Sequence, residues 1–182
     1  MPMNPADLRA HAERLGAWLD GAGPDAEALA TATADFRAAL GTFLKAGDLL
    51  PAVSAACLLS VALRLGARGE AEEDAVPVLR EACETAERGR DAAIEHAETN
   101  GVDEANTAAY VSVTNEAGEA LSALGEALRR GEEAERSFRA AAARFGEAAA
   151  GYRRLGTDGE ARRAEIRALG ARASAALAAG DP

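Results

Sequence analysis

The chain has 182 residues, of which 48% are hydrophobic but only 4% aromatic. Alanine and leucine supply most of the apolar content, and both favour helices over strands, so the composition predicts an all-α protein. The formal net charge of −10 argues against a general nucleic-acid or anionic-membrane binder. We expect no membrane span, because even the apolar residues 49–65 are interrupted by polar, charged or proline residues.

The N-terminal residues and the two cysteines both indicate where the protein is located. Residues 1–5 contain neither a basic stretch nor an apolar run, which predicts no signal peptide. Cys57 and Cys83 lie within helical patterns and not at metal-ligand spacing, so we expect both to be reduced core residues. These observations together predict a cytoplasmic protein.

The first three helices are expected before residue 66. Asn4 caps the first, which starts at a proline and continues to Leu19 with apolar residues at three- and four-residue steps. A turn rich in glycine and proline separates it from a second helix over residues 25–46. Asp48 is the expected N-cap of a third helix over residues 49–65, which is apolar around most of its circumference and therefore central.

A fourth helix is expected between two glycine-containing turns. Its acidic start suits a helix N-terminus, with Asp74 as the cap and Pro77 in the first turn. It runs to about Thr99, and Asn100 with the following glycine closes it.

The remaining three helices follow from Asp103 onward. Residues 110–114 are β-like in composition, but the apolar stripe continues through them at helical spacing, so we interpret them as part of a fifth helix. A turn near residues 130–131 leads into a sixth helix. Thr157 and Glu160 form a predicted capping box that opens the seventh.

A pattern in the second and third helices returns 109 residues later. Between residues 14–66 and 123–175 there are 11 identities, which include a turn glycine and an aromatic residue of the helix stripe. The sequence therefore predicts one all-helical domain over residues 1–182 with an internal duplication. Its two units cover about residues 4–66 and 103–179, joined by the helix at about 70–99.

This repeat unit resembles the tetratricopeptide-like family of helical hairpins. The residues that carry the resemblance are Phe145, Ala148, Ala149, Tyr152, Gly156 and Ala161, and more loosely Phe36, Ala39, Leu40, Phe43, Gly47 and Ala52. The family's second-helix aromatic and closing proline are replaced, by Glu165 and Ala173 in the later unit. The resemblance implies a short right-handed solenoid that binds a peptide or protein on a concave surface, and the alternative architecture is an antiparallel bundle of about seven helices.

Charge is distributed unevenly along the chain. Residues 70–126 hold 15 Asp/Glu against 3 Arg, a balance of −12, whereas residues 129–172 hold 11 Arg against 7 Asp/Glu, a balance of +4. The simplest interpretation is that the acidic and basic helices lie side by side and neutralise each other. The alternative is a docking surface for an acidic partner, since arginine binds carboxylates through two hydrogen bonds. Its residues would be Arg129, Arg130, Arg153, Arg154, Arg162 and Arg163.

No catalytic or metal-binding pattern is apparent in the sequence. The two histidines lack the Glu-x-x-His spacing of di-iron bundles, and no phosphate-binding loop or nucleophile elbow occurs. We therefore expect no cofactor and a non-enzymatic scaffold or adaptor for protein partners, with a homodimer possible through exposed Ala/Leu stripes. A small-molecule-binding or regulatory bundle is the first alternative, with Trp18 and Tyr110 lining its pocket.

Two further alternatives remain open from the sequence. One is an enzyme of unrecognised type. The other is a secreted helical-hairpin substrate of a specialised export system, although the Trp18 turn lacks the Trp-x-Gly motif of that family.

Overall fold

The computed structural model describes residues 10, 13, 15, 18, 25–68 and 70–180. Over these residues the protein is helical and contains no strand, which confirms the predicted all-α class. The structure defines six helices in these ranges, where seven were expected for the whole chain, since most of the first predicted helix lies outside them. The helices are α2 (Ala26–Ala46), α3 (Leu49–Gly66), α4 (Glu72–Asn100), α5 (Glu104–Leu128), α6 (Glu132–Arg154) and α7 (Asp158–Ala179).

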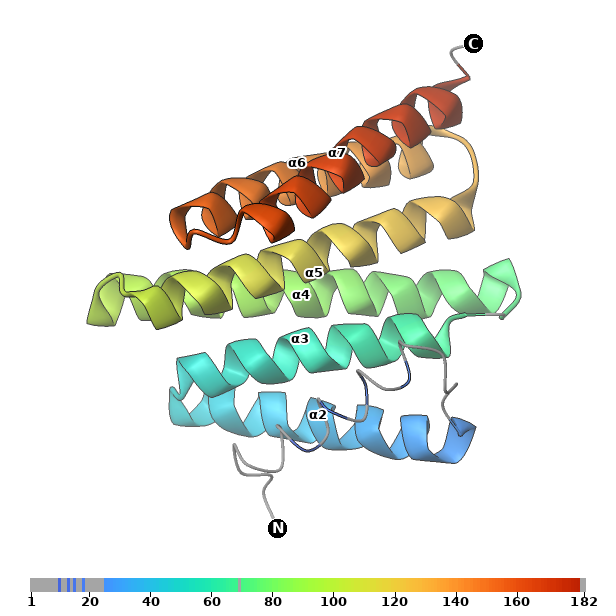
Figure 1. Cartoon of the computed structure of the whole chain (residues 1–182). Coiled ribbons are helices and arrows are strands. Elements are labelled where there is room, and N and C mark those ends of the chain that lie inside the picture. Colours follow the sequence, from blue (N-terminus) through green and yellow to red (C-terminus); the bar gives the residue numbers. More distant parts are fainter. Residues whose placement is uncertain are drawn as a thin grey trace.

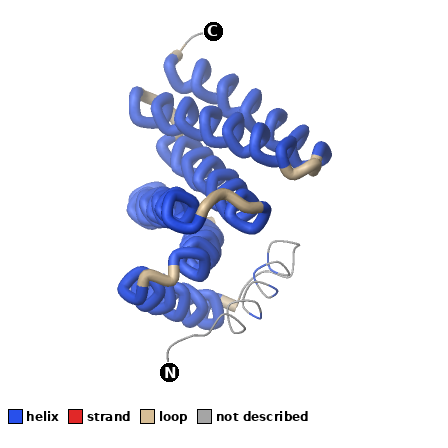
Figure 2. Tube along the Cα trace, turned by 90° about the vertical axis from the view of Figure 1, so that its left-hand side faces the viewer, coloured by secondary structure: helices blue, strands red, loops and turns tan. Residues whose placement is uncertain are grey.

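Consecutive helices pack on one another in chain order. Short turns join them, so neighbours run in opposite directions, and α2 and the α6–α7 pair lie at opposite ends of the array (Figure 1). The same order is visible when the molecule is turned by 90° (Figure 2). The principal contact that skips a helix is between α3 and α5. This arrangement is that of an antiparallel bundle extended along one direction.

The core is built largely from alanine and leucine with a few aromatic residues. The main apolar cluster joins α2, α3, α4 and α5 around the buried Phe36, and Leu15 and Trp18 also pack on it. Smaller clusters join α6 to α7 around Phe138 and Phe145. The rings of these two residues lie against glycines of α5, so helices α5 and α6 approach closely.

Helix α3 is the central helix that the sequence predicted. By length and composition it is the one helix of the described residues that is apolar enough to cross a membrane. Half of it is nevertheless buried inside the protein, and it carries Ser60 and Arg64, which both bond to Glu116 of α5. These contacts are those of a core helix.

The predicted start of the fourth helix is wrong. Helix α4 begins at Glu72 with Ala71 as N-cap, so Asp74 is not the cap and Pro77 lies in the second turn. Its acidic first turn interacts favourably with the helix dipole, which supports the earlier start. Pro77 then removes one hydrogen bond to a carbonyl four residues earlier, a cost confined to the N-terminal end of a 29-residue helix.

Two of the predicted side-chain caps also do not form. Asp48 and Thr157 occupy N-cap positions, but neither side chain accepts a capping hydrogen bond. Their ψ angles are 73° and 68°, whereas the residues whose side chains do cap, Asp25 and Asp103, have extended ψ angles of 127° and −178°. The smaller ψ angles follow from the turn, because the backbone N–H of Asp48 or Thr157 also bonds to a carbonyl at the end of the preceding helix. The capping box predicted at Thr157 is therefore wrong, and its hydroxyl donates to the Tyr152 carbonyl instead.

The α2–α3 and α6–α7 turns have the same local geometry at positions 109 residues apart. Gly47 and Gly156 have φ angles of 74° and 72°, in the left-handed region that glycine adopts most easily. The next residue, Asp48 or Thr157, donates its backbone N–H to the carbonyl five residues before it, at 2.9 Å or 3.0 Å. The two turns with similar geometry are therefore the two turns that the 109-residue sequence repeat aligns.

Candidate functional site

Helix α7 buries its small side chains and exposes its large ones. Every buried residue of this helix is an alanine. Ile166, Leu169 and Leu177 are 68%, 62% and 69% exposed. A surface helix normally turns its large apolar side chains toward the core, so the usual amphipathic arrangement is reversed here.

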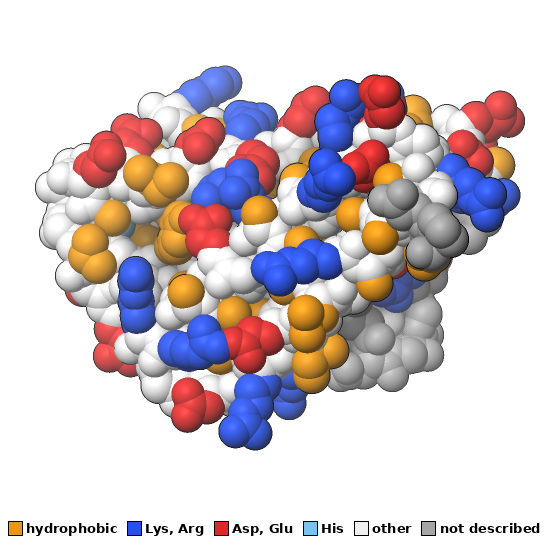
Figure 3. Space-filling model, turned by 90° about the horizontal axis from the view of Figure 1, so that it is seen from above, with side chains coloured by type: hydrophobic (Ala, Val, Ile, Leu, Met, Phe, Trp, Pro, Cys, Tyr) orange, Lys and Arg blue, Asp and Glu red, His pale blue; other side chains and the backbone are white. Residues whose placement is uncertain are grey.

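The exposed apolar residues of α7 fall on one face. Steps of three and four residues bring Ile166, Leu169, Gly170, Ala173 and Leu177 to the same side of the helix, and all five are exposed; we call this face the outer stripe. Seen from above, the end of the molecule formed by α6 and α7 shows apolar side chains among arginine and acidic ones (Figure 3). Three large exposed apolar side chains on one face of an outermost helix offer a surface for contact with another protein.

The six predicted docking arginines do not form one surface. Arg129 and Arg130 lie in the α5–α6 turn, whereas the other four lie around the α6–α7 turn. The two groups are at opposite ends of α6, and a 23-residue helix is about 34 Å long. The two groups belong to the same basic segment of the sequence but are far apart in space.

Half of these arginines are engaged in ion pairs. Arg129 lies 3.8 Å from Glu72, Arg163 lies 2.6 Å from Glu160, and Arg153 pairs with Glu165. Within the described ranges, Arg130, Arg154 and Arg162 make no ion pair. Pairs also link the acidic and basic helices, as the simpler interpretation predicts: Arg144 of α6 with Glu87 of α4, and Arg167 of α7 with Glu119 of α5.

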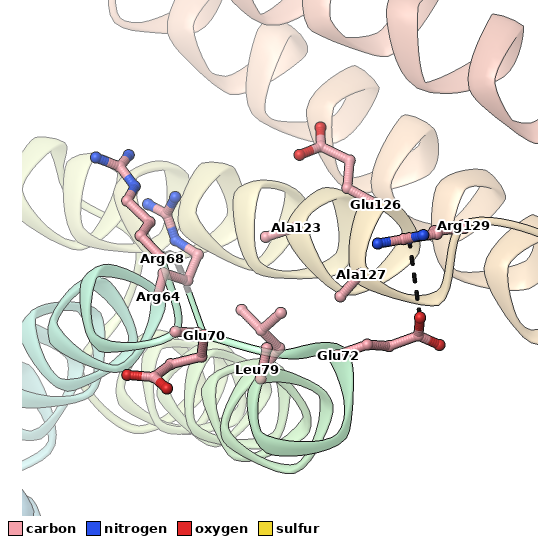
Figure 4. A pocket seen from close by; sticks show the side chains of 11 residues that line it. Arg64, Arg68, Glu70, Glu72, Leu79, Ala123, Glu126, Ala127 and Arg129 are labelled. Atoms are coloured by element: carbon pink, nitrogen blue, oxygen red, sulfur yellow. Dashed lines mark ion pairs between the residues drawn. The ribbon is translucent and has the colours of Figure 1, made fainter.

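Arg129 also lines a pocket of about 260 Å³. The pocket lies between the end of α3, the start of α4 and the end of α5, and its charged rim surrounds Leu79 and four alanines (Figure 4). Arg64, Arg68 and Arg129 face Glu70, Glu72 and Glu126 around it. Charges of both signs are thus balanced at this opening.

Backbone strain marks the same position. Arg129 has φ 60° and ψ −58°, and it is the one residue other than glycine with positive φ in the described part of the chain. Such conformations cost about 1–3 kcal/mol and occur often at functional positions. We therefore regard the pocket as a second candidate site.

A buried arginine connects three helices in the interior. Arg90 of α4 donates hydrogen bonds to Thr114 Oγ1 at 3.2 Å and to the Tyr110 hydroxyl at 3.1 Å, both on α5. It also bonds to Glu87 Oε2 at 2.6 Å and to both carboxylate oxygens of Glu147 on α6 at 3.1 Å. This set of contacts, the Arg90 network, holds α4, α5 and α6 together.

Tyr110 and Arg144 complete the Arg90 network. The Tyr110 hydroxyl donates to Glu147 Oε1, and its ring lies 5.6 Å below the Arg90 guanidinium. Arg144 donates to Glu87 at 2.8 Å. Partial burial would raise the pKa of Glu87, but hydrogen bonds from Arg144 and Arg90 outweigh it and hold that pKa below its usual value.

A second buried ion pair joins α3 to α5. Arg64 donates two hydrogen bonds to the Glu116 carboxylate, each 2.8 Å long, and the Ser60 hydroxyl donates a third at 2.8 Å. Burial raises the pKa of Glu116, although Arg64 and Ser60 favour its ionised form. Burial also raises the pKa values of Cys57 and Cys83 to about 12, so both thiols are poor nucleophiles at neutral pH.

The structure does not bring Trp18 and Tyr110 into one pocket. Trp18 packs on the main cluster, whereas Tyr110 packs beside Val53 and Val113 and bonds into the Arg90 network. Neither residue lines the pocket at Arg129 or the larger one, of about 630 Å³, between α2, α3 and the start of α4.

The sequence analysis did not single out Arg90, Glu147 or Glu116. One signal was available for the first two: Glu87 and Arg90, and likewise Arg144 and Glu147, are three residues apart, a spacing that pairs charges on a helix. Among the described residues, no group of three or more His, Cys, Asp or Glu is placed to hold a metal ion. Comparisons with protein-family models, curated proteins and solved structures find no match.

Proposed function

We propose that this protein is a non-enzymatic helical scaffold that binds a protein partner through the outer stripe of α7. The observation that carries the proposal is the reversed orientation of this helix. Three large apolar side chains are more than half exposed, while every buried residue of the helix is an alanine. Leaving such residues in water is unfavourable, and a partner that covers them gains the free energy of their burial.

Affinity capture with matched variants tests the proposal. Wild type, Ile166→Glu/Leu169→Glu and Val102→Glu are each used as bait in extracts of the source cells. Val102, in the α4–α5 turn, is 80% exposed and provides an equally exposed apolar control away from the stripe. We expect a protein that wild type and Val102→Glu capture and the double variant loses; identical captured sets would contradict the proposal.

The pocket at Arg129 supports a second candidate function, the binding of a small molecule. Arg68, Glu70 and Glu126 on its rim make no ion pair within the described residues, and together they are complementary to a ligand that carries both charges, such as a free amino acid. A thermal-shift screen of amino acids with wild type and Arg68→Ala tests it. Stabilisation of wild type alone would support this function, and no shift with any amino acid would argue against it.

We also propose that the α2–α3 and α6–α7 hairpins derive from one duplicated, tetratricopeptide-like hairpin. The matched φ angles of Gly47 and Gly156 and the matched turn hydrogen bonds support this. An experimental structure in which the two hairpins fail to superpose at the 109-residue offset would contradict it.

A further inference from the structure

We propose that the partner of the outer stripe is a second copy of this chain, and that two α7 helices pack antiparallel across a two-fold axis near Leu169 and Gly170. This inference rests on the proposed function and names the partner. A two-fold interface requires that one surface be complementary to itself. The outer stripe meets this requirement in both shape and charge.

Large and small residues of the stripe are arranged symmetrically about its centre. In an antiparallel pair centred between Leu169 and Gly170, residues whose numbers add to 339 face each other. Leu169 then faces Gly170 of the second copy, and Ile166 faces Ala173. A Cβ placed on Gly170 meets no atom within 4 Å, so the helix surface is open to solvent at this point. Ile166 and Leu169 thus each meet a small residue, as in close helix packing, whereas Leu177 faces Arg162.

Charges flanking the stripe are complementary in the same register. Glu165 and Arg172 lie on the same flank of the helix, and a two-fold axis brings equal flanks together. Their numbers add to 337, so Glu165 of one copy lies about 3 Å along the axis from Arg172 of the other, within reach of two long side chains, twice per dimer. Glu165 also pairs with Arg153 of its own chain. Arg172 makes no ion pair within the described residues of its own chain, so it is available.

The ends of the helix favour the same orientation. Arg162 and Arg163 lie near the start of α7, and its last turn contains no basic residue. Antiparallel packing places this basic start beside the C-terminal carbonyls of the second copy, where the helix dipole is negative. Helix α7 is about 33 Å long and about 10 Å wide, so its footprint is on the order of 330 Å² per chain, less than half that of a standard interface. We therefore expect a weak, concentration-dependent dimer.

Sedimentation velocity from micromolar to millimolar concentration measures the association. We expect Leu169→Glu to raise the dissociation constant about tenfold or more, because it places a charge in the apolar contact. Val102→Glu serves as the control and should associate like wild type. Leu169 is exposed, so far-UV circular dichroism and the melting temperature should show that the variant is folded.

Cysteine cross-linking determines the register. Gly170→Cys should form a disulfide-linked dimer on mild oxidation, because position 170 of one chain lies close to position 170 of the other at the two-fold axis. Leu177→Cys should not, because antiparallel packing separates the two copies of position 177. Wild type, treated in the same way, controls for Cys57 and Cys83. Equal cross-linking at 170 and 177 would overturn the antiparallel arrangement.

Charge reversal tests the Glu165–Arg172 contact. Arg172→Glu should weaken the dimer, and Glu165→Arg/Arg172→Glu should restore it, since the pair is rebuilt with opposite signs. A double variant as weak as the single one would contradict the contact. Wild type that remains monomeric at millimolar concentration would overturn the dimer, while the scaffold proposal would stand if the stripe variants still lost a captured partner.

Discussion

Gly151 of α6 makes a close contact with Val111 of α5. A Cβ at this position would be 2.2 Å from Val111 Cγ2 and would have to displace a β-branched side chain that has one preferred rotamer in a helix. The absence of a side chain at Gly151 therefore sets the separation of the two helices.

We expect Gly151→Ala to lower the free energy of unfolding by about 1–3 kcal/mol, because the added methyl group overpacks the contact. Gly146→Ala on the same helix is the control, since its Cβ meets nothing within 4 Å. That change should instead stabilise the protein by about 0.5–1 kcal/mol, as alanine is the better helix former. Chemical denaturation measures both, and equal effects would show that the close contact is not limiting.

Glu87 connects stability to pH. Its pKa in the folded protein is below the ordinary value of 4.5, so the unfolded chain binds its proton first as the pH falls. The stability that Glu87 contributes is therefore fully present above pH 4.5 and is lost as the pH decreases through the lowered folded pKa.

Comparing wild type with Glu87→Gln in unfolding experiments at several pH values checks this. We expect the variant to be less stable at neutral pH, and the difference to shrink as the pH falls below 4.5. Glu81→Gln, which removes an exposed partner of Arg37, should change stability little at neutral pH. A difference between wild type and Glu87→Gln that is constant over this range would contradict the assignment.

At the scale of the elements, the α6–α7 contact depends on small side chains. Ala142 of α6 is buried in one cluster with Ala168 and Ala171 of α7, and every buried residue of α7 is an alanine. Two helices joined in this way lie close together and leave no space for a larger residue.

We expect Ala142→Leu to destabilise the protein by about 1–3 kcal/mol, because it forces α6 and α7 apart. Ala150→Leu on the same helix places the same side chain in solvent and should change stability by less than about 0.5 kcal/mol. Thermal and urea unfolding of the two variants distinguishes them, and an Ala142→Leu variant as stable as wild type would indicate a looser interface.

The sequence predicted the helices better than the contacts between them. The glycines at 47, 101, 131 and 156 all have positive φ and all lie between helices, so turn positions could be located from residue type. Residues such as Arg90 and Glu147 are 57 positions apart, and their pairing depends on how α4 packs beside α6, which no local pattern encodes. The outer stripe was anticipated only as exposed Ala/Leu surface, because the apolar spacing of a helix does not say which of its faces meets the core.

For the whole molecule, stability should vary along the array. Helix α7 packs chiefly on α6, whereas α3, α4 and α5 are each enclosed by several neighbours. In arrays in which most contacts are between neighbours, the outermost element opens first.

Hydrogen–deuterium exchange of the monomer at low concentration tests this expectation. Amides of α7 should exchange faster than those of α3 and α5, because α7 can open without disturbing the main cluster. Higher protein concentration should slow exchange in α7 alone if its stripe is covered by a second copy. Uniform exchange in all helices would indicate a single cooperative unit.

The buried guanidinium groups of Arg64 and Arg90 have a consequence for heat tolerance. Near room temperature, buried ion pairs contribute little net stability, because removing both charges from water costs about as much as their attraction returns. The hydration of ions becomes less favourable on warming, so that cost decreases. The two networks that join α3 to α5 and α4 to α6 therefore strengthen these junctions most when the protein is hot.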